Sequence, residues 1–156
     1  AVILGCSDSR VPAEIIFDQG LGDLFVIRVA GNAVARSQIG SVEFAVETFG
    51  VSLVVVMGHT GCGLVQAALA SAETGAPAPS PSLEFIIEPL RPCMKSLCES
   101  GLSGEPLLDA AVKENIGLSV DRLKEGSEII RRLVEEDTLR VVGAEYSLET
   151  GEVNFL

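Results

Sequence analysis

The sequence predicts an α/β fold, with a central, mainly parallel β-sheet flanked by helices and an antiparallel edge strand near the C-terminus. Strand-length apolar runs alternate with longer segments whose apolar residues recur every three or four positions. The runs at 1–5 and 52–58 are almost unbroken, as in parallel strands that are covered on both faces. Near the end of the chain, the turn residues ETG precede VNFL and indicate the antiparallel edge strand.

Each element has its own local signal. We expect strands at 1–5, 23–30, 52–58 and 139–148, and a last one in VNFL. We expect helices at 12–17, 37–50, 64–72, 83–99, 105–125 and 127–137, on both faces of the sheet. Pro12 suits a first helical turn, Gly50 suits a helix end and Ser127 suits an N-cap. The Pro-, Ala- and Ser-rich stretch 74–82 is expected to be a loop.

Length and composition predict one domain over residues 1–156. The net charge of −11 makes nucleic acid and anionic membranes poor partners. No apolar run approaches the ~20 residues that cross a bilayer, and no signal peptide is visible. We therefore expect a cytoplasmic protein. The chain begins inside a strand-like run, so an upstream targeting segment stays open as an alternative.

Two fragments place metal-ligand residues where strands end. Cys6 ends the first strand, and His59 ends the strand with three consecutive valines. Because the carboxyl ends of parallel strands share one edge of a sheet, these residues should meet there. Cys62 follows His59 in an HxxC spacing at the start of a helix. Two thiolates and one imidazole suit zinc, and three protein ligands leave a fourth position open, as in catalytic sites.

Plainer explanations exist for each fragment alone. HxxC arises by chance, because cysteine is often simply buried. GHTGCG (58–63) could be a degenerate dinucleotide loop, although its glycines follow GxxGxG and not GxGxxG. Asp8 and Arg10 could form an ordinary ion pair. Cys93 and Cys98 have no partner spacing and are interpreted as buried or incidental.

Together, CSDSR (6–10) and GHTGCG (58–63) closely resemble the CxDxR and HxxC signature of bacterial-type β-class carbonic anhydrases. The resemblance includes DLFVIRVAGN (23–32) and GAEYSLETG (143–151). It implies a zinc lyase that interconverts carbon dioxide and bicarbonate, and a homodimer or dimer of dimers. The ligands of one Zn²⁺ per chain would be Cys6, His59 and Cys62.

The resemblance also implies further roles. A hydroxide generated on zinc attacks carbon dioxide, Asp8 orients that hydroxide and Arg10 restrains Asp8. Phe25 would help to wall the carbon dioxide pocket, often across the dimer interface, although a plain core position on its strand fits equally well. The Gly63 amide would donate to bicarbonate. Arg28 and Tyr146 match two residues of a regulatory bicarbonate site, but Ile3 replaces its tryptophan. We therefore expect an incomplete regulatory site and a zinc position that Asp8 does not close.

The resemblance also concerns segments before the first strand and reactions other than carbon dioxide hydration. Family members carry an N-terminal helical arm and a pocket glutamine before the first strand, and this chain begins too late to contain them. The same zinc site could instead hydrolyse carbonyl sulfide or carbon disulfide. A non-catalytic zinc- or bicarbonate-binding module, closed by Asp8, is the alternative from another class.

Overall fold

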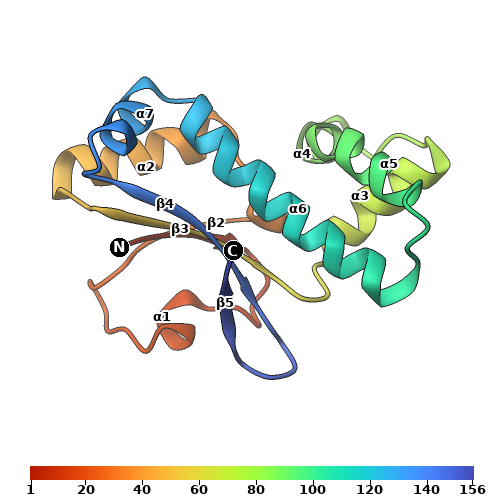
Figure 1. Cartoon of the computed structure of the whole chain (residues 1–156), viewed down its shortest axis with the longest axis horizontal. Coiled ribbons are helices and arrows are strands. Elements are labelled where there is room, and N and C mark those ends of the chain that lie inside the picture. The colour runs from red at the N-terminus through yellow and green to blue at the C-terminus, as the bar shows by residue number, and fades with distance from the viewer.

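A five-stranded sheet with the order β2-β1-β3-β4-β5 forms the centre of the computed structural model, which describes residues 1–156 (Figure 1). The first four strands of this order run parallel, and β5 is antiparallel to β4. The strands are β1 Val2–Cys6, β2 Phe25–Val29, β3 Leu53–His59, β4 Arg140–Tyr146 and β5 Val153–Phe155. The predicted fold class, including its antiparallel edge strand, is confirmed.

The helices lie unequally on the two faces of the sheet. The α-helices are α1 Ala13–Ile16, α2 Arg36–Phe49, α3 Gly63–Thr74, α4 Pro81–Ile87, α5 Arg91–Cys98, α6 Gly104–Glu125 and α7 Glu128–Glu135. In Figure 1, α2, α6 and α7 lie above the sheet, the short α1 lies below it, and α3, α4 and α5 gather to one side. Two 3₁₀ turns complete the list, η1 at Ala30–Asn32 and η2 at Glu88–Leu90.

The helical stretch expected over 83–99 is divided into α4, η2 and α5. Pro89 and Pro92 explain the division, because each lies in the first turn of a new element. Proline lacks the amide hydrogen that a continuous helix needs, but it fits a first turn, where that hydrogen has no helical partner.

Strand register brings two predicted ligands to the same edge of the sheet. Gly5 of β1 pairs with Met57 of β3, so β3 continues past that row and ends at His59. Cys6 is the last residue of β1. The expectation that these two strand ends meet at one edge is therefore confirmed.

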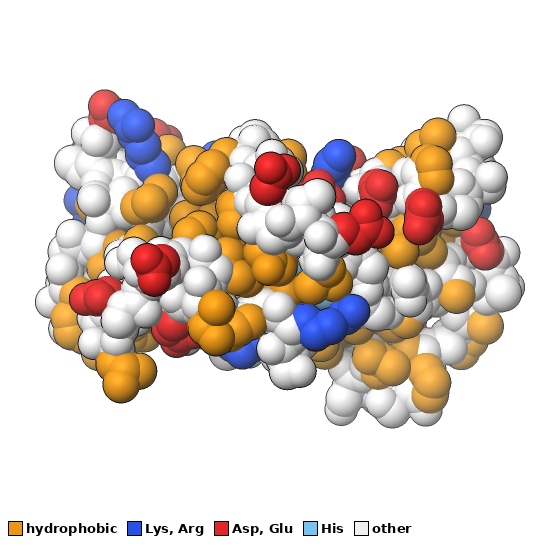
Figure 2. Space-filling model, turned by 90° about the horizontal axis from the view of Figure 1, so that it is seen from below, with side chains coloured by type: hydrophobic (Ala, Val, Ile, Leu, Met, Phe, Trp, Pro, Cys, Tyr) orange, Lys and Arg blue, Asp and Glu red, His pale blue; other side chains and the backbone are white.

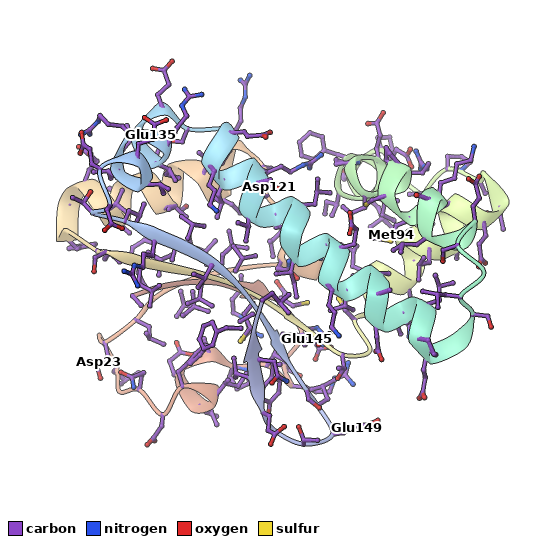
Figure 3. All side chains as sticks on the ribbon, viewed as in Figure 1. Asp23, Met94, Asp121, Glu135, Glu145 and Glu149 are labelled. Atoms are coloured by element: carbon purple, nitrogen blue, oxygen red, sulfur yellow. The ribbon has the colours of Figure 1, made fainter.

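One hydrophobic core of 32 buried residues joins the sheet to the helices around it. Every residue of β1 is buried, and the central part of β3 is equally enclosed. Met94 of α5 is fully buried, so this core extends to the helices at the side of the sheet (Figure 3). The face viewed from below carries patches of hydrophobic side chains at the surface (Figure 2). None of the helices combines the length and apolar character needed to cross a membrane.

Candidate metal centre

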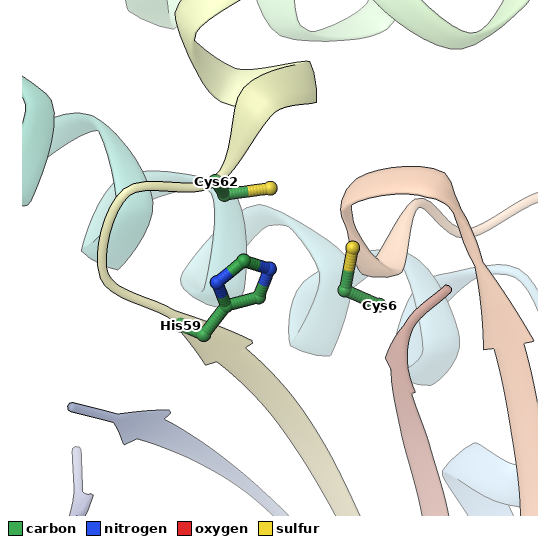
Figure 4. A group of neighbouring side chains, drawn as sticks. All are labelled: Cys6, His59 and Cys62. Carbon is green, nitrogen blue, oxygen red and sulfur yellow. The ribbon is translucent and has the colours of Figure 1, made fainter. Parts of the chain in front are cut away.

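Cys6, His59 and Cys62 form a compact buried cluster at the carboxyl edge of the sheet (Figure 4). The ligand atoms of the three residues all lie within 4.8 Å of one another. Cys6 and His59 end neighbouring strands, and Cys62 is the N-cap residue of α3. Two sulfurs and one imidazole nitrogen therefore converge from three separate elements.

The turn between His59 and Cys62 depends on glycines for two different reasons. Gly61 adopts a φ of 64°, a left-handed conformation that glycine reaches without steric cost. Gly58 has no space for a side chain, because a Cβ there would lie 2.6 Å from Ile116 Cγ1. The chain can thus turn tightly from β3 into α3 while α6 packs directly on β3.

The hydrogen bonding of His59 leaves one ring nitrogen available to a metal. Nδ1 lies 2.9 Å from the Thr60 carbonyl oxygen, so Nδ1 carries the hydrogen and donates it. Nε2 is buried without any hydrogen-bond partner, and in this tautomer it presents a lone pair. Such an orphaned buried acceptor is costly unless something binds it. This arrangement matches the orientation of histidines that bind metals, whose other nitrogen donates to a carbonyl or carboxylate.

The two sulfurs of the cluster differ in their affinity for a proton. The nearby Cys62 thiol, despite burial, lowers the pKa of Cys6 to about 3. The same interaction, together with burial, raises the pKa of Cys62. Burial opposes protonation of His59, but the nearby Cys6 sulfur and the Thr60 carbonyl outweigh it and raise the pKa of His59. A divalent cation would displace the protons of the cluster, because metals bind the deprotonated forms.

Backbone amides also point at the Cys6 sulfur. The Asp8 and Gly31 nitrogens lie 3.5 Å and 3.3 Å from Sγ and donate to it. Amide donors stabilise negative charge on sulfur, so the site favours a Cys6 thiolate. Soft sulfur ligands with an imidazole suit zinc and not magnesium or calcium. The donor set and the free Nε2 therefore fit the predicted zinc ion.

Asp8 and Arg10 form a bidentate pair beside the cluster. Arg10 Nε donates to Asp8 Oδ1 at 3.0 Å, and Nη2 donates to Oδ2 at 2.6 Å. The Arg10 backbone amide also donates to Oδ1 at 3.0 Å. These hydrogen bonds hold the pKa of the Asp8 carboxyl well below its usual range. Asp8 therefore stays ionised and faces Arg10.

Arg28 supports the same loop from the neighbouring strand. Its Nε donates to the Cys6 carbonyl oxygen at 2.9 Å, and its Nη2 donates to the Asp8 carbonyl oxygen at 2.5 Å. Tyr146 ends β4 and pairs with His59. Since β1 and β3 separate β2 from β4, the backbones of the Arg28 and Tyr146 strands lie about 14 Å apart.

Phe25 and Gly63 occupy different surroundings. Phe25 pairs with Val2 at the opposite end of β1 from Cys6, about 13 Å along the strand. Its ring centroid lies 6.3 Å from that of Phe44 and 6.1 Å from that of Phe49. Gly63 is the first residue of α3, and a Cβ there would meet nothing within 4 Å. Open space therefore adjoins Gly63, whereas Phe25 is remote from the cluster of its own chain.

Sequence reasoning missed the turn beside Cys6 and the α6 residues that support it, and it placed the remaining cysteines outside the cluster. The turn residues are Gly31 and Asn32, and the α6 residues are Asn115 and Ser119. The Gly-Asn pair after a strand was a visible turn signal, and buried asparagine and serine in an amphipathic helix were a weaker one. Cys93 and Cys98 are half-buried on α5, and burial raises the pKa of both thiols.

Comparisons with known proteins agree with this geometry. The sequence matches the family described as carbonic anhydrase over residues 1–153. A carbonic anhydrase of Mycolicibacterium smegmatis is 39% identical over 153 residues, which cover 98% of this chain and 72% of that protein. Carbonic anhydrase 2 of Mycobacterium tuberculosis is 40% identical over 151 residues, or 97% of this chain and 71% of that protein. The crystal structure of the β-carbonic anhydrase CafA of Aspergillus fumigatus has a TM-score of 0.87 and 29% identity, and the match covers 99% of this chain and 74% of that one.

Proposed function

The chain belongs to the β-class carbonic anhydrases, which are lyases, and we propose that it hydrates carbon dioxide reversibly with one zinc ion held by Cys6, His59 and Cys62. The observation that carries the proposal is the buried His59 Nε2, which lacks a partner within a cluster of two cysteine sulfurs. Zinc, when bound, supplies a Lewis acid that lowers the pKa of a coordinated water, so hydroxide becomes available near neutral pH.

Asp8 and Arg10 are proposed to orient the attack. With zinc bound, the Asp8 carboxylate would accept a hydrogen bond from the hydroxide and so direct an oxygen lone pair toward the carbon of carbon dioxide. Arg10 keeps Asp8 ionised and fixed through its bidentate contact. The reaction would then yield bicarbonate, and the proton of the original water would pass to solvent or buffer. The observed Asp8–Arg10 pairing supports the form of the site in which Asp8 does not bind the metal.

The remaining site predictions have unequal support. At the N-terminus of α3, beside open space, the Gly63 amide is placed to donate to bicarbonate. Arg28 engages the carbonyls of Cys6 and Asp8, so we propose that it braces the loop, and its predicted role with Tyr146 in bicarbonate regulation stays untested. Phe25 lies at the opposite end of β1 from Cys6, so it can contact substrate only at the metal centre of a second subunit.

We also propose that residues 1–156 are one domain that assembles as a homodimer or a dimer of dimers. A single cluster of 32 buried hydrophobic residues joins the sheet and the helices. Several large apolar side chains remain at the surface, including Leu21 at 101% and Ile15 at 77% exposure. Exposed apolar side chains are typical of subunit contacts where they gather into patches, as on the face in Figure 2. Light scattering coupled to size-exclusion chromatography would measure the assembly.

Stopped-flow hydration of carbon dioxide on protein of known zinc content tests the function. We expect about one zinc per chain and zinc-dependent turnover. In Cys62→Ala both should be lost, because a direct ligand is removed. Cys98→Ser is the matched control, since Cys98 lies outside the cluster, and it should keep both. Stoichiometric zinc without hydration at neutral or alkaline pH would contradict the proposed reaction.

A further inference from the structure

The turn that faces the Cys6 sulfur has an unusual backbone. Gly31 and Asn32 both adopt left-handed conformations, with φ values of 61° and 46°. Asparagine tolerates this conformation better than most residues, but two such residues in succession need support from their surroundings. Both residues are buried in the interior, so solvent cannot supply that support.

Helix α6 supplies hydrogen bonds to this turn from a distant part of the sequence. Asn115 Nδ2 donates to the Gly31 carbonyl oxygen at 2.9 Å and to Asn32 Oδ1 at 3.3 Å. One helical turn later, Ser119 Oγ donates to the Asn32 carbonyl oxygen at 3.1 Å. Asn115 is 1% exposed and Ser119 is 2% exposed. Because all these groups are buried, their hydrogen bonds do not compete with water.

Helix α3 closes the opposite side of the turn. A Cβ on Gly31 would collide with the Leu64 side chain, which lies two residues after Cys62. The Gly31 backbone is therefore enclosed between α3 and α6. In this position its amide nitrogen lies 3.3 Å from Cys6 Sγ and donates to it.

We propose that Asn115 is a positioning residue for the metal-binding Cys6 thiolate, because it holds the Gly31–Asn32 turn whose amide donates to Cys6 Sγ. This inference rests on the proposed function, since it assumes that Cys6 binds zinc. An amide hydrogen bond fixes the direction of the sulfur lone pairs and withdraws charge from them. When Asn115 is lost, the turn can relax and the amide moves away from the sulfur.

Cobalt substitution tests this inference without relying on turnover. The energy of thiolate-to-cobalt(II) charge transfer depends on how strongly the sulfur lone pairs are stabilised. We expect Asn115→Ala to shift this absorption band to longer wavelength and to weaken zinc binding, measured by chelator competition, by about tenfold. Ser119→Ala, which removes one hydrogen bond, should shift the band in the same direction by less. Ser119→Ala also provides the test of the inference if Asn115→Ala does not fold.

Ser127→Ala is the matched control. Its hydroxyl is also buried and hydrogen-bonded, but its partners are Glu43 and Ile130 and not residues of the turn. The band of this control should not move, although its unfolding free energy should fall. A shift in the control equal to that of the folded Asn115→Ala or Ser119→Ala variant would show general loosening and overturn the inference.

The outcomes separate this inference from the proposed function. If the wild-type protein binds neither zinc nor cobalt, both fail. If the wild-type protein binds cobalt with thiolate charge transfer and hydrates carbon dioxide, the proposed function stands. An unchanged band and unchanged zinc affinity in the folded Asn115 and Ser119 variants would then overturn the positioning role alone.

Discussion

Gly58→Ala would test the tight packing between β3 and α6 directly behind the metal centre. The added Cβ would lie 2.6 Å from Ile116 Cγ1 and 2.7 Å from Ile116 Cδ1. Carbon atoms in favourable contact are ~3.5–4.0 Å apart, so one element must retreat by about 1 Å. Ile116 is fully buried and cannot turn into solvent. We expect the free energy of unfolding to fall by about 1–3 kcal/mol, as for other overpacked cores.

A second substitution shows whether Ile116 is the cause. Ile116→Ala removes both colliding carbons and should by itself cost about 2–5 kcal/mol, because it leaves a cavity. In the double variant, the new methyl group at position 58 enters that cavity. The double variant should therefore be more stable than the sum of the single changes predicts, by about 0.5–3 kcal/mol.

Urea unfolding of the metal-free protein, followed by circular dichroism, measures all four corners of this cycle. Gly117→Ala is the control on the same helix, because a Cβ there meets nothing within 4 Å. That control should stabilise the protein by about 0.5–1 kcal/mol, since alanine favours helices over glycine. Strictly additive effects of the changes at 58 and 116 would refute the collision, and a stabilising Gly58→Ala would refute it more directly.

Three further predictions concern the site. Arg10→Gln should retain zinc but lower the rate of hydration by about 100-fold in stopped-flow assays. The loss should be equal at pH 6 and pH 8, because an Asp8 carboxyl released from Arg10 has a pKa of only ~3.9 and stays ionised. A loss confined to acidic pH would contradict an orienting role for Arg10. Zinc affinity, measured by chelator competition, should rise with pH, because the raised pKa values of Cys62 and His59 keep protons on the metal-free site that zinc must displace; affinity independent of pH would exclude those protons. Hydration by the wild type should increase through and above neutral pH, since two thiolates make the ion less acidifying than three imidazoles do, and a flat rate from acid to neutral pH with intact enzyme would refute this.

Local sequence patterns predicted the fold and the cluster because both depend on short-range signals. An apolar run that ends in a cysteine, and another that ends in a histidine, place Cys6 and His59 at one edge of any parallel sheet. The division of the stretch 83–99 was also readable in principle from Pro89 and Pro92. Each of these features is determined by residues that are close together in the sequence, and each is present in the structure.

The contacts that support the cluster were not predictable in the same way. Asn115 donates a hydrogen bond to Gly31, 84 positions away in the sequence. No local sequence pattern indicates which buried side-chain amide contacts which turn. Arg28 is similar, because its place on a predicted strand does not reveal its hydrogen bonds to the carbonyl oxygens of Cys6 and Asp8. Phe25 could be placed on a strand, but its distance from Cys6 follows only from the register of β1 with β2.

Backbone amides belong to the metal centre on electrostatic grounds. Two thiolates would neutralise the charge of a zinc ion and weaken its effect on water. The Asp8 and Gly31 amides donate to Cys6 Sγ. These two donors withdraw charge from that sulfur and so preserve the Lewis acidity of a bound ion. Any residue can supply a backbone amide, so the sequence does not show which amides face the sulfur. Gly31 is the exception, because a side chain at this position would collide with Leu64 and glycine is therefore required.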